Sequence, residues 1–89
     1  MNDVLMDLSE ETSRNLGVQP LDAIMTERGL RNADLVKASA EPMTHKMVQR
    51  GRKGRLLSRR VQERICRALG AAAGQQYALT ELFNYKGKP

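Results

Sequence analysis

Aromatic residues and cysteine are scarce in this chain of 89 residues, which holds two tyrosines, one phenylalanine, no tryptophan and one cysteine. The single cysteine, Cys66, has no partner for an internal disulfide, which fits a reducing compartment such as the cytoplasm. The one histidine, His45, lies 21 positions from Cys66, and these two residues do not make a metal-ligand set. We therefore expect no metal and no cofactor.

Long apolar runs and catalytic motifs are also missing. No run approaches the roughly 20 apolar residues of a membrane span, and the acidic start "MNDVLMDLSEET" is unlike a basic secretory signal. The sequence has no Ser-His-Asp or Cys-His arrangement, no carboxylate pair in an apolar setting and no phosphate-binding glycine loop. These absences predict a cytoplasmic protein that is not an enzyme and has no membrane partner.

Positive charge is concentrated in one part of the chain. Residues 46–67 contain nine lysines and arginines against Glu63 alone, a net charge of +8, whereas residues 1–19 have a net charge of −3. Such crowding of like charges indicates a surface that meets a polyanion. The segment "THKMVQRGRKGR", residues 44–55, has five of these cations and His45 but no aromatic residue. That composition disfavours a membrane-surface helix and favours nucleic acid.

The first half of the chain predicts two helices joined by a tight turn. Pro20 suits the first turn of a helix, and Gly29 is placed to end that helix in a left-handed conformation. A second helix begins at Arg31 or Asn32. It must be short, because Pro42 disfavours helix at the residue before it.

The second half predicts three more helices. Thr44 is a plausible N-cap of a third helix that runs to about Arg50 and is closed by Gly51 and Gly54, and Ser58 caps a fourth. An apolar seam recurs at four-residue spacing along the fourth helix, which ends at Gly70 or Gly74: Leu57, Val61, Ile65, Leu69. A short fifth helix contains Leu79, Leu82 and Phe83, with Thr80 as a candidate cap. The predicted fold is all-α, a compact bundle of about five short helices.

Three stretches together resemble the Cro and lambda-repressor-like helix-turn-helix family over roughly residues 20–83. They are "LRNADLVKAS" as the supporting helix, "MTHKMVQRGRKGR" as the recognition helix with its exit, and "LLSRRVQERICRAL" as the helix that closes the core. The resemblance implies that Leu35 and Val48 fix the angle between the first two of these helices. It also implies that Gly54 lets the backbone turn near DNA phosphates.

The sequence departs from the family pattern in three places. The turn "SAEPM" is about two residues longer than usual and has Ala40 where a glycine is common. Arg52 replaces an acidic residue, and Gly51 stands where a bulky core residue is usual. The domain organisation that follows is an acidic N-terminal segment at 1–19, a helix-turn-helix DNA-binding domain at 20–85 and a basic tail at 86–89.

The resemblance also implies which side chains meet DNA. In a major groove, the first turns of the recognition helix reach the base edges, while loop residues and helix starts hold the phosphates. The candidates for base contact are His45, Lys46, Gln49 and Arg50. The candidates for phosphate contact are Arg31, Asn32, Thr44, Lys53 and Arg55.

The function predicted from these features is sequence-specific binding of double-stranded DNA by a transcriptional regulator of prokaryotic or phage type. A homodimer is expected, because one recognition helix covers only a few base pairs. The candidate dimer contacts are Leu79, Leu82, Phe83 and Tyr85, or Val4, Leu5 and Leu8. An equal alternative is that Leu82 and Phe83 close the core of the monomer. Two other functions stay open: a helix-turn-helix antitoxin or adaptor that acts through protein contacts, and a nonspecific nucleic-acid binder.

Overall fold

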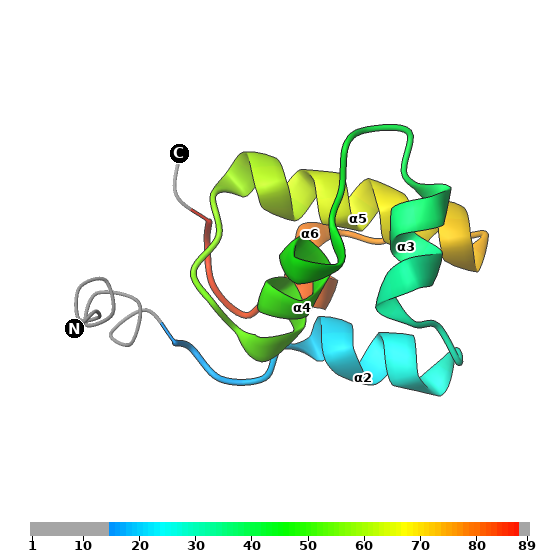
Figure 1. Ribbon diagram of the computed structural model, residues 1–89. Helices are drawn as coiled ribbons and strands as arrows, with labels where there is room; N and C mark the ends of the chain where they lie inside the picture. Colours follow the sequence, from blue (N-terminus) through cyan, green and yellow to red (C-terminus); the bar gives the residue numbers. More distant parts are fainter. Residues whose placement is uncertain (1–14, 88–89) are drawn as a thin grey trace.

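The computed structural model describes residues 15–87 and shows an all-α fold in this part of the chain, as the sequence predicts. Its helices are α2 (Pro20–Glu27), α3 (Asn32–Ala38), α4 (His45–Lys53), α5 (Arg59–Ala73) and α6 (Leu79–Leu82), shown in Figure 1. Within residues 15–87 there is no strand, and one isolated β-bridge joins Asn15 to Arg55.

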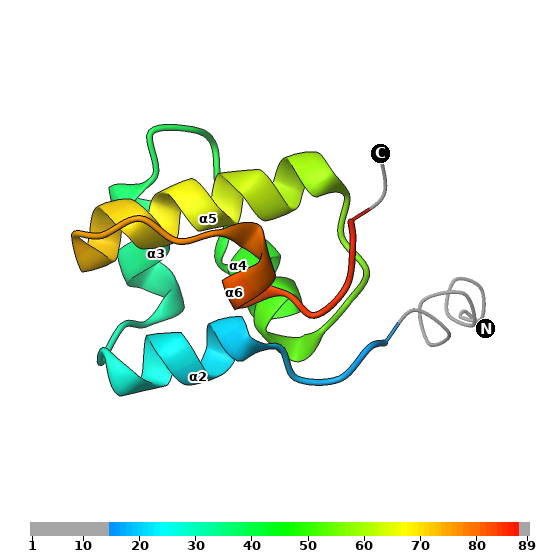
Figure 2. The ribbon, with the colours of Figure 1, turned by 180° about the vertical axis from the view of Figure 1, so that it is seen from behind.

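The helices form a bundle in which α2 and α5 lie on opposite sides, with α4 and α6 between them (Figure 1). The short helix α3 contacts both α4 and α5. Figure 2 shows the reverse side, where α6 lies in front of α4 and the chain leading to α6 runs along α5. The helices α3 and α4 therefore pack directly against each other, as the two central helices of the predicted helix-turn-helix should.

The core is made by apolar side chains from all five helices and from the connection before α5. The buried apolar residues are Leu21, Met25, Leu35, Val48, Leu57, Ile65, Ala68, Leu69, Leu82 and Phe83. Leu35 and Val48 are both 0% exposed and belong to the same cluster. The two residues to which the family resemblance gives the angle between α3 and α4 are thus both buried in one core.

Local signals set most of the helix ends. Pro20 occupies the first turn of α2, and Gly29 has the left-handed φ of 67° expected after a helix. The hydroxyl of Thr44 accepts a hydrogen bond from the Met47 N–H at 3.0 Å. That of Ser58 accepts one from the Val61 N–H at 3.2 Å. Both predicted N-caps are confirmed.

The expectation that α4 stops at about Arg50 and is closed by Gly51 is wrong, because the helix continues to Lys53 and ends at Gly54. Gly51 is buried inside the helix. A Cβ at this position would lie 3.0 Å from Ile65 Cδ1 and 3.3 Å from Leu21 Cδ2. Neighbouring helices thus fill the space that a bulky residue would take, and Lys53 lies on the helix instead of on an exit loop.

The C-terminal helices bring a further correction. Gly74, with φ of 73°, ends α5, and Gly70 lies inside that helix. Thr80 does not cap α6, because the helix begins one residue earlier at Leu79. The backbone N–H of Ala78 instead donates to the Glu81 carboxylate at 2.9 Å. The carboxylate of Glu81, in the first turn, therefore accepts the hydrogen bond of the backbone N–H group at the start of α6.

The chain before α2 is joined to the end of α4. The Leu16 N–H donates to the Gly54 carbonyl at 2.7 Å, and the Gln19 N–H donates to the Arg52 carbonyl at 3.0 Å. Gly54 has φ of 93°, and a Cβ there would lie 1.7 Å from the carbonyl oxygen of Gly17. Residues 15–19, which the sequence assigned to the N-terminal segment, therefore fix the exit of α4.

Shortening Leu35 tests the packing between α3 and α4. Leu35→Ala should lower the free energy of unfolding by about 2–5 kcal/mol, because it removes buried methyl groups and leaves a cavity. Val18→Ala is the matched control, since Val18 is 69% exposed and should change the stability little. Thermal melts of both variants measure the difference. Equal melting temperatures for Leu35→Ala and the parent would contradict this placement.

A pair of glycine substitutions tests the close approach at Gly54. Gly54→Ala and Gly29→Ala both place a side chain at a positive φ, which costs about 1–2 kcal/mol. Only at Gly54 does the new Cβ also collide with the backbone of Gly17, whereas nothing lies within 4 Å at Gly29. Chemical denaturation should therefore show a clearly larger loss for Gly54→Ala. Equal losses would mean that residues 15–19 do not pack against the end of α4.

Candidate nucleic-acid interface

One side of α4 is buried and the opposite side is exposed. Val48 and Gly51 face the core, and their positions follow from the helical repeat, because they are three residues apart. The exposed residues Lys46, Gln49, Arg50 and Lys53 share the other side. α4 contains no acidic residue, so this side presents cations and an amide. We call these four residues the outer face of α4.

The structure places all four predicted base-contact residues on exposed positions of α4. Three of them, Lys46, Gln49 and Arg50, lie on the outer face. His45, the first residue of the helix, lies beside this face and lines a hollow of about 570 Å³ together with the start of α3. Ion pairs formed within residues 15–87 do not involve Lys46 or Lys53, so their charges are not neutralised by a neighbour there.

The predicted phosphate contacts lie in three places. Arg31 and Asn32, at the start of α3, line the same hollow as His45. Thr44 is the N-cap of α4 and lines a second hollow, of about 290 Å³, on the other side of that helix. Lys53 and Arg55 lie at the far end of α4, where Arg55 is partly buried opposite Asn15. The outer face is thus a ridge between two hollows.

Arg52, which the sequence marked only as a departure from the family pattern, is a further site residue. Its Nε donates to the carboxylate of Asp22 on α2 at 2.6 Å, and its Nη1 donates to Asn32 Oδ1 at 2.8 Å. Asn32 Nδ2 in turn donates to Gln49 Oε1 at 2.8 Å. The helical repeat could have indicated that Arg52 contacts the bundle, because Arg52 follows the core residue Val48 by four positions and therefore lies near the inward side of α4.

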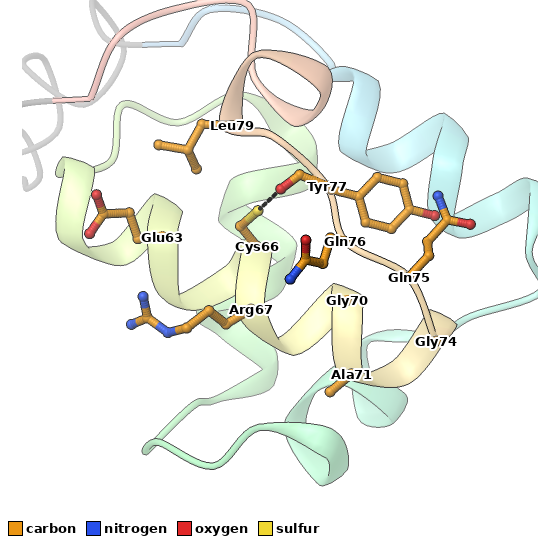
Figure 3. A pocket seen from close by; sticks show the side chains of 10 residues that line it. All are labelled: Glu63, Cys66, Arg67, Gly70, Ala71, Gly74, Gln75, Gln76, Tyr77 and Leu79. Carbon is orange, nitrogen blue, oxygen red and sulfur yellow. Dashed lines mark hydrogen bonds between the residues drawn. The ribbon is translucent and has the colours of Figure 1, made fainter.

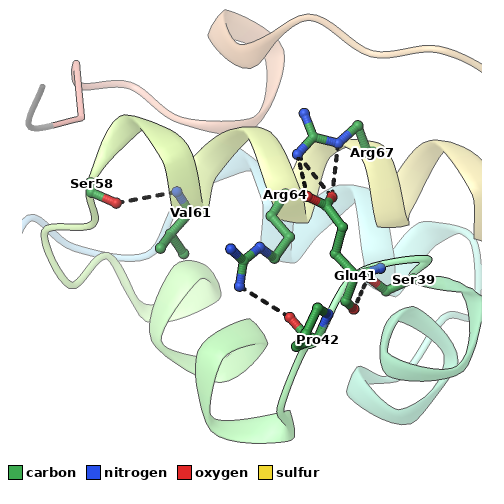
Figure 4. Close-up of polar contacts among 7 residues, drawn as sticks. All are labelled: Ser39, Glu41, Pro42, Ser58, Val61, Arg64 and Arg67. Atoms are coloured by element: carbon green, nitrogen blue, oxygen red, sulfur yellow. Dashed lines mark hydrogen bonds and ion pairs between the residues drawn. The ribbon is translucent and has the colours of Figure 1, made fainter.

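Two arginines of α5 hold the connection that leads into α4 (Figure 4). The Nε and Nη2 atoms of Arg67 donate to the two carboxylate oxygens of Glu41, each at 2.9 Å, and Arg64 Nη1 donates to the Pro42 carbonyl at 3.1 Å. The Ser39 hydroxyl donates to the Glu41 carbonyl at 2.7 Å in the same connection. Both arginines therefore bind the chain between α3 and α4.

Tyr85 holds the connection that leaves α4. Its hydroxyl donates to the Arg55 carbonyl at 3.0 Å and accepts from the Leu57 N–H at 3.1 Å. Burial raises the pKa of the Tyr85 hydroxyl above its ordinary value, so it stays protonated and able to donate at neutral pH. The two ends of α4 are therefore both tied to the bundle, the start through α5 and the end through Tyr85 and residues 15–19.

A groove of about 800 Å³ lies elsewhere, between α5 and the chain that leads to α6 (Figure 3). Cys66 Sγ donates to the Tyr77 carbonyl there at 3.1 Å. Burial, with a smaller contribution from Glu81, raises the pKa of the Cys66 thiol, which keeps it protonated at neutral pH. The groove carries both Glu63 and Arg67, so it lacks the single sign of charge that the outer face of α4 presents.

Other kinds of site find no support in residues 15–87. No group of histidine, cysteine, aspartate and glutamate side chains there is arranged to hold a metal ion. A helix with the length and apolarity needed to cross a membrane is not found in that range either. The exposed basic side of α4 is therefore the feature on which we base a function.

Comparisons with known proteins do not identify a family for this chain. No protein-family model, curated protein or solved structure matches this chain. The resemblance to the Cro and lambda-repressor-like family accordingly stays a prediction from the sequence motifs.

Proposed function

We propose that this protein binds double-stranded DNA sequence-specifically by inserting α4 into the major groove, as a transcriptional regulator of prokaryotic or phage type. The observation that carries the proposal is the outer face of α4, where Lys46, Gln49, Arg50 and Lys53 are exposed together on a helix without acidic residues. An α-helix with its side chains is about 10–12 Å wide, which fits a major groove about 12 Å wide.

The surroundings of α4 support this docking. His45, Lys46, Gln49 and Arg50 lie in the first turns, from which side chains reach base edges in a helix-turn-helix. Arginine and lysine donate to guanine O6 and N7, and glutamine pairs with adenine or donates to other acceptors. The hollows on either side of the helix contain Arg31 and Thr44, which suit the two phosphate backbones that border the groove.

Nonspecific binding of nucleic acid is the main competing function. Alanine variants of Arg50 and Lys53 distinguish it from sequence-specific binding. Arg50→Ala should cost about 1–3 kcal/mol on the preferred site and relax discrimination at one base-pair position, because a base contact is lost. Lys53→Ala should weaken binding to all duplexes alike, and it should flatten the plot of log affinity against log salt by roughly one unit. Salt titrations on selected and scrambled duplexes measure both effects.

Lys37→Ala is the charge-matched control for this experiment, because Lys37 is exposed in the last turn of α3, away from the end that contacts α4. It should change affinity less than Lys53→Ala. Equal losses for Arg50→Ala and Lys53→Ala on every sequence would leave only a nonspecific electrostatic patch. No change in either variant would contradict nucleic-acid binding altogether.

We also propose that the protein binds DNA as a homodimer, which would place two α4 helices about 34 Å apart on successive turns of the duplex. Leu82 and Phe83 are buried within the monomer, so they close its core and are not exposed for a dimer contact. Leu79 and Tyr85 are partly buried, and the apolar residues Leu16 and Val18 are exposed beside the exit of α4. Val4, Leu5 and Leu8 lie outside the described residues.

Sedimentation tests the dimer directly. We expect the mass of two chains on one palindromic duplex, with the dimer favoured by DNA because both half-sites are then filled. Varying the half-site spacing away from about one helical turn should reduce affinity in the same samples. A single chain both in solution and on the best duplex would rule out the dimer.

A further inference from the structure

We propose that Asp22, Arg52 and Asn32 form a directional hydrogen-bond relay that turns the donor end of the Gln49 amide towards the DNA bases. The inference rests on the proposed function and deepens it, because it assigns a base preference to one residue of the outer face. In this relay Asp22, Arg52 and Asn32 are positioning residues, and Gln49 is the residue that reads the base.

The direction of the relay is set by Arg52. A guanidinium group has only donors, so each neighbour that bonds to it must supply an acceptor. Asp22 supplies a carboxylate oxygen at 2.6 Å, and the Arg52 side chain is only 18% exposed, which keeps it in place. Its Nη1 then donates to Asn32 at 2.8 Å. Asn32 must therefore turn its oxygen, Oδ1, towards Arg52.

Asn32 passes this direction on to Gln49. With Oδ1 facing Arg52, the Nδ2 group of Asn32 is the end that faces α4, and it donates to Gln49 Oε1 at 2.8 Å. The two ends of a carboxamide point to opposite sides of its terminal carbon. Gln49 therefore turns Oε1 towards Asn32 and Nε2 away from it. Nε2 keeps two N–H donors for a base, whereas Oε1 keeps one lone pair.

This asymmetry predicts which bases Gln49 favours. In the major groove, guanine and thymine present the keto oxygens O6 and O4 as acceptors, whereas adenine and cytosine present the amino groups N6 and N4 as donors. A glutamine amide that rotates freely would serve both kinds of base. One that is held with Nε2 outward should favour a keto base, and guanine above thymine, because guanine offers N7 as a second acceptor.

Reversing the relay tests the proposal. Asn32→Asp puts a carboxylate, which has only acceptors, between Arg52 and Gln49, so the glutamine must turn Nε2 inward and Oε1 outward. The preference at the Gln49 position should then change from keto towards amino bases, by a factor of about ten in the ratio of affinities. The variant should fold, since an acidic residue in the first turn of α3 is favourable.

Two controls separate the relay from simpler effects. Ala33→Asp adds the same charge at the next, exposed position of α3 and should weaken all duplexes without altering the preference. Arg52→Lys keeps a group with only hydrogen-bond donors and should retain the keto preference. Arg52→Met has no donor to fix the orientation of the Asn32 amide and should reduce that preference. The duplexes carry each of the four base pairs at the position where Gln49→Ala abolishes discrimination.

NMR of the full chain without DNA supplies an independent measurement. The Nδ2 protons of Asn32 should exchange slowly with solvent in the parent, because one of them is hydrogen-bonded to Gln49. In Asn32→Asp the slow protons should be those of Gln49 Nε2. An unchanged keto preference in Asn32→Asp, or fast exchange of Asn32 Nδ2 in the parent, would overturn the relay while DNA binding stands. Failure of the parent to bind any duplex would overturn both the proposed function and the base preference.

Discussion

The close approach of α4 to α2 and α5 at Gly51 is the constraint on which the candidate interface depends. Because Gly51 has no side chain, α4 lies directly against Leu21 of α2 and Ile65 of α5. Val48 is the one large residue of α4 that is fully buried. Burying one valine stabilises a fold by roughly 1.5–3 kcal/mol, which is little for a helix of this length. Because so few positions of α4 are used for packing, the four residues of the outer face remain exposed.

Polar contacts at both ends of α4 add to this small apolar contact. Glu41 and Arg67 hold the connection before α4, and Tyr85 holds the connection after it. Exposed ion pairs such as Glu41–Arg67 contribute about 0–1 kcal/mol, so they add little to global stability. Reading a DNA base requires that a side chain be held in a fixed place, and ties of this kind restrict where α4 can move.

The structure divides the basic segment 46–67 into cations with different roles. Lys46, Arg50 and Lys53 point outward from α4. Other arginines of the segment contribute to the fold: Arg52 pairs with Asp22, Arg59 with Glu63, Arg64 with the Pro42 carbonyl and Arg67 with Glu41. The sequence shows only the total charge, because the partners of three of these arginines lie 22 to 30 positions away.

The sequence by itself determined the helices and most of their ends. The N-caps Thr44 and Ser58 act within three residues, and the glycines that end helices need only their own positive φ, so these signals are local. The apolar repeat along residues 57–69 likewise identified Leu57, Ile65 and Leu69, which are buried, because burial follows the helical period.

Tertiary structure alone decided how far α4 extends and which way its side chains are held. Gly51 stays helical because Leu21 and Ile65 pack against it, although a glycine there looked like a helix end. The orientation of Gln49 depends on Asn32, 17 positions away. Contacts over such distances along the chain exist only once the helices have packed, so no local pattern could reveal them.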